Sequence, residues 1–310
     1  MNMLTMPLQN PPPESHETGL LSRPDGTCLR FGLFPASTAS GTVLIVTGRS
    51  EYIEKYHETA ADLGQAGYAC AVLDLRGQGG STRIIADQRA GHVDRFSDYT
   101  EDLLAFIRSV QTAGLPEPFF LMGHSLGGLI ALSAAAQLQE SLAGLILCAP
   151  FTGLAGRPLP ESMLRPIARA FALAGLAKRP VGRHEEPRSF HQQSLTSDSR
   201  RYQRNMEAAR GTNYLLGAPT FGWVAEALGQ IARITRPHAL ARIDLPVLLL
   251  SAGRDTIIKP ATQRRIAGQL KTCKLVEIPG AGHEILQETD PLRDKAMAAI
   301  IDFLGENLRR

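Results

Sequence analysis

Apolar residues along the chain gather in short runs, and the segments between these runs carry apolar residues at helical spacing. The runs cover residues 42–46, 69–73, 119–122, 144–148, 245–251 and 274–278. They are continuous rather than alternating, as expected of strands buried on both faces. The segments with helical spacing are 53–66, 97–111, 125–139, 260–270 and 290–307. Strands that alternate with helices predict an α/β fold with a mostly parallel central sheet flanked by helices.

Two parts of the chain depart from this alternation. The segment Cys28–Phe34 follows the turn signal Pro24-Asp25-Gly26 and is typical of one arm of an antiparallel hairpin. From residue 151 to about 240 there are prolines, arginines and helical spacing but no strand pattern. This predicts a helical cap, or lid, inserted between two strands of the core.

The predicted domain organisation has four segments. Residues 1–16 are polar and contain three consecutive prolines, which predicts a disordered leader without the features of a signal peptide. The core would then comprise 17–150 and 241–310, separated by the cap at 151–240. A length of 310 residues is sufficient for one large core and an inserted smaller unit.

Composition narrows the possible partners and cofactors. The net charge of +3 gives no reason to expect nucleic-acid binding. Residues 151–210 carry eleven Arg or Lys against five Asp or Glu, a local net charge of +6. Solvated helix faces explain this excess, and transient contact with an anionic membrane surface is the alternative. Nothing in the sequence predicts an oligomeric state.

Cysteine usage and hydropathy suggest the compartment. The four cysteines form no C-x-x-C metal or redox pattern, and no window has the ~18 uninterrupted apolar residues of a membrane span. We therefore expect no metal or cofactor and a cytoplasmic location, with a position peripheral to the inner membrane surface as the alternative.

The stretch Gly123-His124-Ser125-Leu126-Gly127 lies between a predicted strand and a predicted helix. It matches the G-x-S-x-G nucleophile elbow, in which a serine is exposed on a tight turn above a parallel sheet. Glycines are needed there because strand and helix approach closely. Serine is a weak nucleophile at neutral pH, so the motif requires a base, an acid and oxyanion donors elsewhere.

Two later loops provide the base and the acid. Asp255 follows the run at 245–251, and His283 follows the run at 274–278. The chain order Ser, Asp, His is the one used by α/β-hydrolases, which predicts Ser125 as nucleophile, His283 as base and Asp255 as its orienting acid.

Other titratable residues near these motifs have simpler interpretations. Glu284 and Glu288 are alternative acids on less suitable positions, and His124 is expected to be structural. The glycine-rich stretch that begins at Asp74 lacks the Lys-Ser/Thr of a P-loop, so it is interpreted as a structural loop rather than a nucleotide site.

An oxyanion hole needs two backbone amides. The sequence predicts that of Leu126, directly after the serine, and that of Arg49, on the loop after residues 42–46. The Arg49 side chain could also bind a substrate phosphate, or it could form an ion pair with Glu51 or Glu54.

These motifs together resemble those of the monoacylglycerol lipase and lysophospholipase branch of the α/β-hydrolase superfamily. The resemblance rests on Gly48–Tyr56, Asp74–Gly79, Gly91–Tyr99, Gly123–Gly128 and Gly280–Glu284. One departure is Thr47, which stands where the wider branch has histidine before the oxyanion-loop glycine.

The resemblance implies hydrolysis of the single acyl ester of a lysophospholipid or monoacylglycerol, without metal or cofactor. Phe221 and Trp223 in the cap would help to receive the acyl chain, although they could instead form the cap's own core. A carboxylesterase, thioesterase or peptidase could use the same triad, because fold and triad do not determine the substrate. A non-catalytic binding protein is a further alternative, disfavoured by the intact triad.

Overall fold

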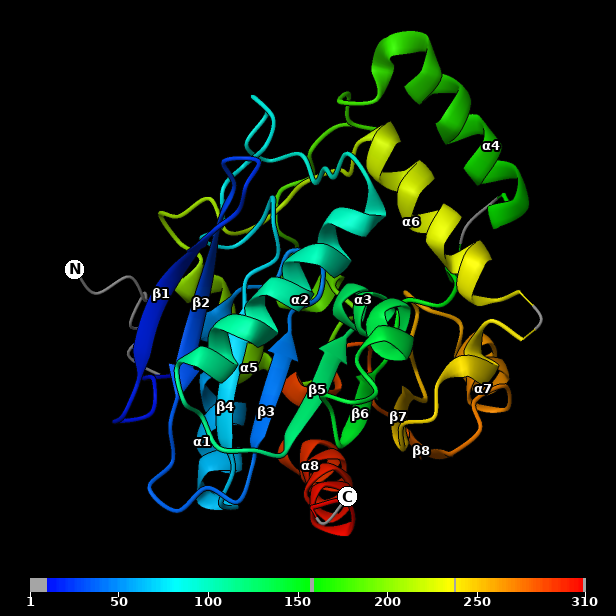
Figure 1. The fold of residues 1–310 in the computed structure, drawn as a ribbon. Coiled ribbons are helices and arrows are strands. Elements are labelled where there is room, and N and C mark those ends of the chain that lie inside the picture. Colours follow the sequence, from blue (N-terminus) through cyan, green and yellow to red (C-terminus); the bar gives the residue numbers. More distant parts are fainter. Residues whose placement is uncertain (1–9, 157–158, 237, 309–310) are drawn as a thin grey trace.

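A computed structural model describes residues 10–156, 159–236 and 238–308. Its centre is an eight-stranded sheet with the order β1-β2-β4-β3-β5-β6-β7-β8. The β1–β2 hairpin is antiparallel, β2 runs antiparallel to β4, and the remaining neighbours are parallel (Figure 1). The strands are β1 (Glu17–Ser22), β2 (Cys28–Phe34), β3 (Thr42–Val46), β4 (Ala69–Leu73), β5 (Phe119–His124), β6 (Gly144–Cys148), β7 (Val247–Ala252) and β8 (Cys273–Ile278).

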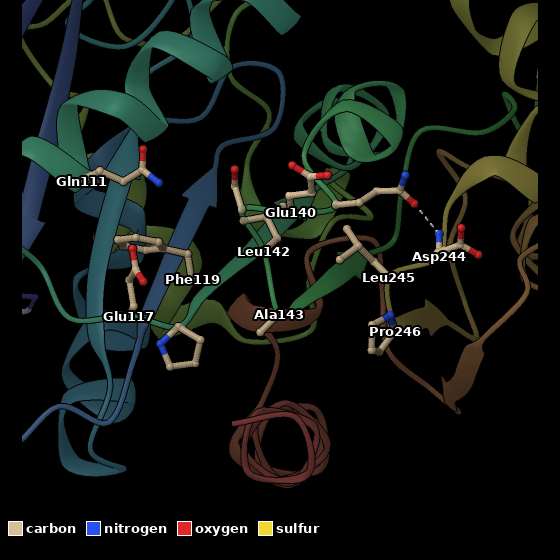
Figure 2. A pocket seen from close by; sticks show the side chains of 12 residues that line it. Gln111, Glu117, Phe119, Glu140, Leu142, Ala143, Asp244, Leu245 and Pro246 are labelled. Carbon is tan, nitrogen blue, oxygen red and sulfur yellow. Dashed lines mark hydrogen bonds between the residues drawn. The ribbon is translucent and has the colours of Figure 1, made fainter. Parts of the chain in front are cut away.

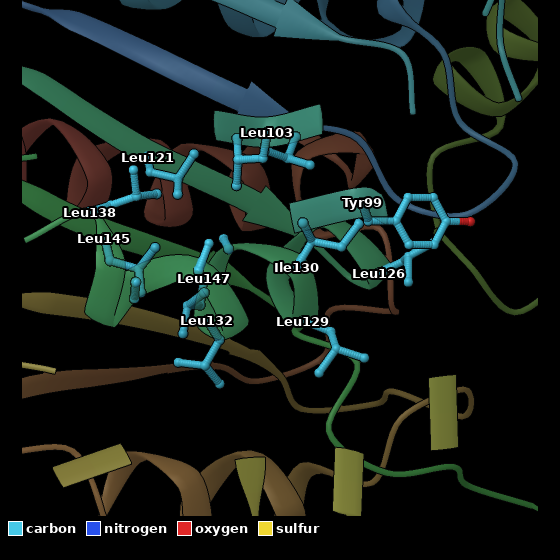
Figure 3. Close-up of a cluster of buried hydrophobic side chains, with 14 of the residues drawn as sticks. Tyr99, Leu103, Leu121, Leu126, Leu129, Ile130, Leu132, Leu138, Leu145 and Leu147 are labelled. Carbon is cyan, nitrogen blue, oxygen red and sulfur yellow. The ribbon is translucent and has the colours of Figure 1, made fainter. Parts of the chain in front are cut away.

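Helices cover both faces of this sheet and bury two apolar clusters against it. On one face α2 (Phe96–Thr112), α3 (Leu126–Ala134) and α7 (Pro260–Ala267) pack over a cluster that Figure 3 shows in part. On the other face lie α1 (His57–Gln65) and α8 (Asp290–Glu306). The central strands are buried along their whole length, which explains their continuous apolar sequences.

The chain between β6 and β7 forms a helical insertion. It contains α4 (Glu161–Phe171), the π-helical turn η3 (Ala172–Leu176), α5 (Ser199–Ala208) and α6 (Phe221–Ile234), with short 3₁₀ turns η4 (Phe190–Gln192) and η5 (Leu240–Arg242). In Figure 1, α4 and α6 lie side by side beyond the end of the sheet, in green and yellow. Three further 3₁₀ turns lie in the core: η1 (Ile53–Tyr56), η2 (Ala135–Gln137) and η6 (Ile285–Gln287).

The two halves of the insertion are attached to the core differently. Arg201 and Arg204 of α5 form ion pairs with Glu58 of α1, at 2.5 and 2.8 Å. Helix α4 instead packs mainly against α6. As a result α5 is fastened to the core by buried arginines, whereas α4 is held by the insertion itself.

The fold class predicted from the sequence is confirmed, with two differences in detail. The second arm of the hairpin is β1, an edge strand whose residues are all at least partly exposed, so it lacked a clear apolar signal. The structured chain also begins earlier than the expected leader boundary. Asn10 is buried, donates to the Glu54 carbonyl oxygen at 2.7 Å, and its own carbonyl oxygen lies 2.9 Å from Nδ1 of His57. Residues 1–9 of that leader lie outside the described residues.

In the part of the chain that the structure describes, no helix is both long and apolar enough to cross a bilayer.

Candidate active site

Ser125 lies on the turn between β5 and α3, with backbone angles φ 49° and ψ −111°. Such angles are costly for a residue with a Cβ and persist only where the surroundings fix them. Here strand and helix are in direct contact, because a Cβ on Gly123 would lie 2.5 Å from the Gly127 oxygen. A Cβ on Gly127 would lie 2.1 Å from the Val46 oxygen of β3. The glycines are therefore required by close backbone packing, as the motif predicted.

The loops after β7 and β8 bring Asp255 and His283 to Ser125. Nε2 of His283 lies 2.9 Å from Oγ of Ser125, and Nδ1 of His283 lies 2.8 Å from Oδ2 of Asp255. The other carboxylate oxygen of Asp255 accepts the amides of Ile257 and Ile258 at 2.8 and 2.9 Å. Burial opposes the charge on Asp255, but the hydrogen bond and charge of His283 and the two amides outweigh it and lower the pKa of Asp255. The side chain is thus held as a carboxylate in one orientation.

The alternative residues near the site have other partners. Glu284 forms an ion pair with Lys55 at 2.7 Å, and Glu288 accepts the Gly282 amide at 2.7 Å. Both ring nitrogens of His124 face away from Ser125, toward Glu51 and the His283 carbonyl oxygen. None of these side chains replaces Asp255 or His283 beside the serine.

The predicted oxyanion donors come from adjacent segments. In the parallel register Val46 is opposite Gly123, so the loop that follows β3 runs beside the elbow. The amide of Leu126 is the first of α3 and has no acceptor within its own helix. Thr47, the residue that departs from the wider branch, donates its hydroxyl to the Leu73 carbonyl oxygen at 3.0 Å. Thr47 therefore fastens this loop to β4.

The Arg49 side chain forms neither of the ion pairs considered from the sequence. Glu51 contacts Lys55 and His124, and Glu54 contacts Arg30. Instead, Arg49 donates to the Gly217 carbonyl oxygen, and its guanidinium carbon lies 5.6 Å from the centre of the Trp223 ring.

Among the described residues, no carboxylate forms an ion pair with this guanidinium, and the buried Nε of Arg49 has no hydrogen-bond partner. The side chain as a whole is half-buried. Burial lowers the pKa of Arg49 to about 10, and the nearby Tyr99 hydroxyl opposes this fall. The side chain still carries its charge at neutral pH, and a half-buried charge of this kind favours an anionic partner.

The two aromatic residues predicted to receive an acyl chain lie at the start of α6. Trp223 is buried, stacks on Phe151 at 6.2 Å, and donates its ring N–H to the Tyr99 hydroxyl at 3.1 Å. Phe221 is partly exposed and stacks on Phe171 of α4 at 4.6 Å. Trp223 therefore belongs to the interface between insertion and core, while Phe221 joins α6 to α4.

Two other features do not contribute to the group formed by Ser125, His283 and Asp255. The Asp74 carboxylate accepts the Gly80 amide at 2.7 Å and the Ile53 amide at 2.9 Å, so the glycine-rich stretch is a tied structural loop. A cavity of about 420 Å³ lies at the opposite, amino-terminal ends of β5, β6 and β7. Figure 2 shows its acidic and apolar lining, in which Gln139 accepts the Asp244 amide at 2.7 Å. No group of three His, Cys, Asp or Glu side chains suited to a metal ion occurs among the described residues.

Sequence patterns did not indicate the buried polar residues behind the site, chiefly Glu51 and Lys55. Both lie within the resemblance motif Gly48–Tyr56, which did not indicate that they are buried or which residues they contact. The one signal in the sequence is that these charged residues follow closely after the end of a predicted strand. That position does not show which residues they contact.

Comparisons with known proteins agree with this geometry. The model of the serine aminopeptidase family S33 matches residues 37–290. Lysophospholipase L2 of Escherichia coli strain K12 is 32% identical over 300 residues, covering 91% of this chain and 86% of that protein. Monoglyceride lipase of Rattus norvegicus is 24% identical over 285 residues, covering 88% and 85%.

Solved structures show the same fold. A soluble variant of the Saccharomyces cerevisiae monoglyceride lipase, solved with a substrate analogue, superposes with a TM-score of 0.74 at 21% identity, covering 94% of this chain and 95% of that one. The chain therefore belongs to the serine aminopeptidase S33 family of α/β-hydrolases, within its lysophospholipase and monoacylglycerol lipase branch, and is a serine ester hydrolase.

Proposed function

We propose that the enzyme cleaves its ester through an acyl-enzyme intermediate formed on Ser125. The observation that carries this proposal is the hydrogen-bonded series from Ser125 Oγ through His283 to Asp255, at 2.9 and 2.8 Å. His283 accepts the hydroxyl proton as Ser125 attacks the ester carbonyl, and it then protonates the leaving alcohol. Water activated by the same imidazole releases the fatty acid. Asp255 holds the imidazole in the tautomer that leaves Nε2 free to accept.

The amides of Leu126 and Arg49 are the proposed oxyanion donors. Both belong to segments beside the serine, and preorganised amides stabilise the tetrahedral anion without reorganisation during the reaction.

The proposed substrate class is a lipid with one acyl ester, either a lysophospholipid or a monoacylglycerol. Relatives carrying each of these names support the class. The uncompensated guanidinium of Arg49 favours the lysophospholipid, because a phosphate diester would supply the missing negative charge. Phe221 and Trp223 would line the acyl side of this site.

The segment 151–240 is proposed to act as a lid that also contacts an anionic membrane surface from the cytoplasm. Met163, Ile167 and Leu173 of the α4–η3 region are 50%, 42% and 79% exposed. Arg165 and Arg169 lie exposed on the same helix. Apolar side chains beside cations are what binding to an anionic interface requires.

The nucleophile is tested with Ser125→Ala and a fluorophosphonate probe. We expect loss of both covalent labelling and ester hydrolysis, with the fold intact by circular dichroism. Ser133→Ala on α3 is the matched control, because that hydroxyl bonds only the helix carbonyl of Leu129 and Gln230. Labelling that survives in Ser125→Ala would refute the assignment.

The substrate class is tested with matched lysophosphatidylcholine, monoacylglycerol, short-chain p-nitrophenyl ester, thioester and aminoacyl-p-nitroanilide substrates. Long-chain oxyesters should be turned over best. A preference for acetate esters, thioesters or the anilide would instead favour a carboxylesterase, a thioesterase or a peptidase. Arg49→Lys should lower kcat/KM for the lysophospholipid more than for the monoacylglycerol, and equal losses would remove the phosphate role.

Membrane contact is tested by sedimentation with vesicles. Binding to phosphatidylglycerol vesicles should exceed binding to phosphatidylcholine vesicles and fall with salt. Leu173→Ser should weaken it without changing hydrolysis of a water-soluble ester. Equal binding to both vesicle types, or none, would contradict the proposal.

A further inference from the structure

His124, the residue before the nucleophile, is buried, and both of its ring nitrogens face acceptors. Nδ1 lies 3.1 Å from Oε2 of Glu51, and Nε2 lies 3.1 Å from the main-chain oxygen of His283. A carbonyl oxygen can only accept. The Glu51 carboxylate already accepts the Gly48 amide and the Tyr56 hydroxyl, so it too is an acceptor here. Both ring nitrogens must therefore donate, and only the imidazolium form has two N–H groups.

The charges around His124 lead to the same form. Glu51 also bonds Lys55 at 3.0 Å, and Lys55 bonds Glu284 at 2.7 Å. The side chains of these three residues are 5%, 7% and 11% exposed, and that of His124 is 7% exposed. If His124 is protonated, it and Lys55 carry two positive charges that balance the two negative charges of Glu51 and Glu284. A neutral ring would leave one buried carboxylate without compensation, which is costly.

The remaining titratable groups that face this cluster are neutral or belong to the triad. Among the described residues they are Tyr52, Tyr56, Cys148 and Tyr202, whose pKa values burial raises, and the His283 ring, whose centre is 4.9 Å from that of His124. Burial alone would disfavour the imidazolium, but the charge of Glu51 outweighs it and raises the pKa of His124.

The imidazolium connects three segments of the active site. His124 is adjacent to Ser125 in the elbow, and it holds the main chain of the His283 loop. Through Glu51 it is joined to the Gly48 amide of the oxyanion loop. A neutral imidazole keeps a single N–H, so loss of the proton would release one of these two connections.

We propose that His124 is a positioning residue, protonated at neutral pH, that fixes the oxyanion loop and the His283 loop relative to the nucleophile elbow. Its effect on catalysis rests on the triad proposed above. Its protonation state does not, and can be measured in the resting enzyme.

The first test is long-range ¹⁵N–¹H NMR of the full chain labelled at histidine, titrated from acid to alkaline pH. We expect the ring of His124, assigned by its loss in His124→Gln, to keep the imidazolium pattern above neutral pH. Glu51→Gln should move its deprotonation to lower pH. His57 is the matched internal control, since it is buried, one of its ring nitrogens has no partner among the described residues, and burial lowers its pKa. A neutral His124 ring at pH 7 would overturn the proposal.

The second test is kinetic. In His124→Gln we expect kcat for a p-nitrophenyl ester to fall roughly 10- to 100-fold with KM little changed, as for a small misplacement of reacting groups. The wild type should also lose activity at alkaline pH where the NMR titration shows His124 deprotonating, and the variant should lack this step. His57→Gln should leave kcat unchanged. Identical alkaline profiles in wild type and His124→Gln would refute the positioning role.

The two proposals fail in different ways. Fluorophosphonate labelling that persists in Ser125→Ala would refute the proposed triad, but it would not affect the NMR result on the protonation of His124. An imidazolium at His124 with no kinetic effect of its deprotonation would remove the positioning role and leave the triad. If His124→Gln does not fold, the His124 ring is assigned by its shift in Glu51→Gln, since His124 is the histidine that contacts Glu51.

Discussion

Replacing Asp255 with asparagine should trap His283 in the wrong tautomer. Oδ1 of Asp255 accepts two amides, those of Ile257 and Ile258, at 2.8 and 2.9 Å, while Oδ2 faces Nδ1 of His283 at 2.8 Å. In Asp255→Asn the carbonyl oxygen has to remain on the two amides, because an NH₂ group cannot accept from them. The NH₂ group would then face Nδ1 of His283 and make it the acceptor. The proton moves to Nε2, which can no longer take the proton of Ser125.

The size of the effect follows from the cost of escaping this arrangement. Rotating the asparagine side chain to restore the productive tautomer would leave two backbone amides without acceptors. Each unsatisfied buried group costs about 1–3 kcal/mol, hence about 2–6 kcal/mol together. At about 1.4 kcal/mol per tenfold change in rate, this corresponds to a loss of roughly 10²- to 10⁴-fold in kcat/KM.

The assay is hydrolysis of a p-nitrophenyl ester near neutral pH by Asp255→Asn, Asp255→Ala and the control Glu277→Gln. Glu277 is an exposed residue of β8 that pairs with Arg264, so its change should leave kcat/KM unaltered. Asp255→Ala imposes no tautomer on His283, and it should therefore be the more active of the two Asp255 variants. The reasoning is refuted if Asp255→Asn keeps more than a tenth of wild-type activity, or if it is more active than Asp255→Ala.

Three further predictions concern stability, measured by urea unfolding. Gly127→Ala should lower the free energy of unfolding by roughly 3 kcal/mol or more, since its Cβ would lie 2.1 Å from a backbone oxygen of β3. Gly229→Ala in α6 is the control: its Cβ would meet no atom within 4 Å, and it should raise the free energy of unfolding by about 0.5–1 kcal/mol. Ser125→Gly should be inactive yet more stable by about 1 kcal/mol, because it relieves the strained φ of 49°. Arg201, Arg293 and Arg204 lower the pKa of Glu58 to about 2 against the opposing effect of burial. The contribution of Glu58 to stability is therefore present above about pH 4.5 and is lost as pH falls toward 2. The unfolding midpoint should fall between pH 5 and 3, and less so in Glu58→Gln.

The sheet was predictable from sequence where burial is complete. The runs 42–46, 69–73 and 144–148 coincide with β3, β4 and β6, because each of these strands is covered on both faces and every residue must be apolar or small. The edge strand β1 has no such requirement, and because all of its residues are at least partly exposed it left no apolar run to detect. The ordered Asn10 is a similar case, since its burial depends on contacts with Glu54 and His57 more than forty residues away.

The triad geometry was also predictable, because the carboxyl ends of parallel strands meet at one edge of a sheet. The partners of Arg49 and His124 were not. Arg49 contacts Gly217, which is 168 residues distant, and His124 contacts Glu51 and His283, which are 73 and 159 residues distant. Polar contacts of this kind depend on how segments far apart in the sequence pack together. Hydrophobic periodicity and secondary-structure propensity therefore do not predict them.

The positions of the proposed catalytic groups depend on two kinds of contact that variants should separate. The elbow is fixed by hard backbone packing, because Gly127 lies directly against the oxygen of Val46 and leaves no gap that could adjust. The loops of Asp255 and His283 leave the sheet and are oriented instead by directional polar bonds, from two amides and from His124. Changes to the packing should therefore reduce stability and activity together. Changes to the polar bonds should reduce activity more than stability, since the apolar clusters on both faces of the sheet remain intact.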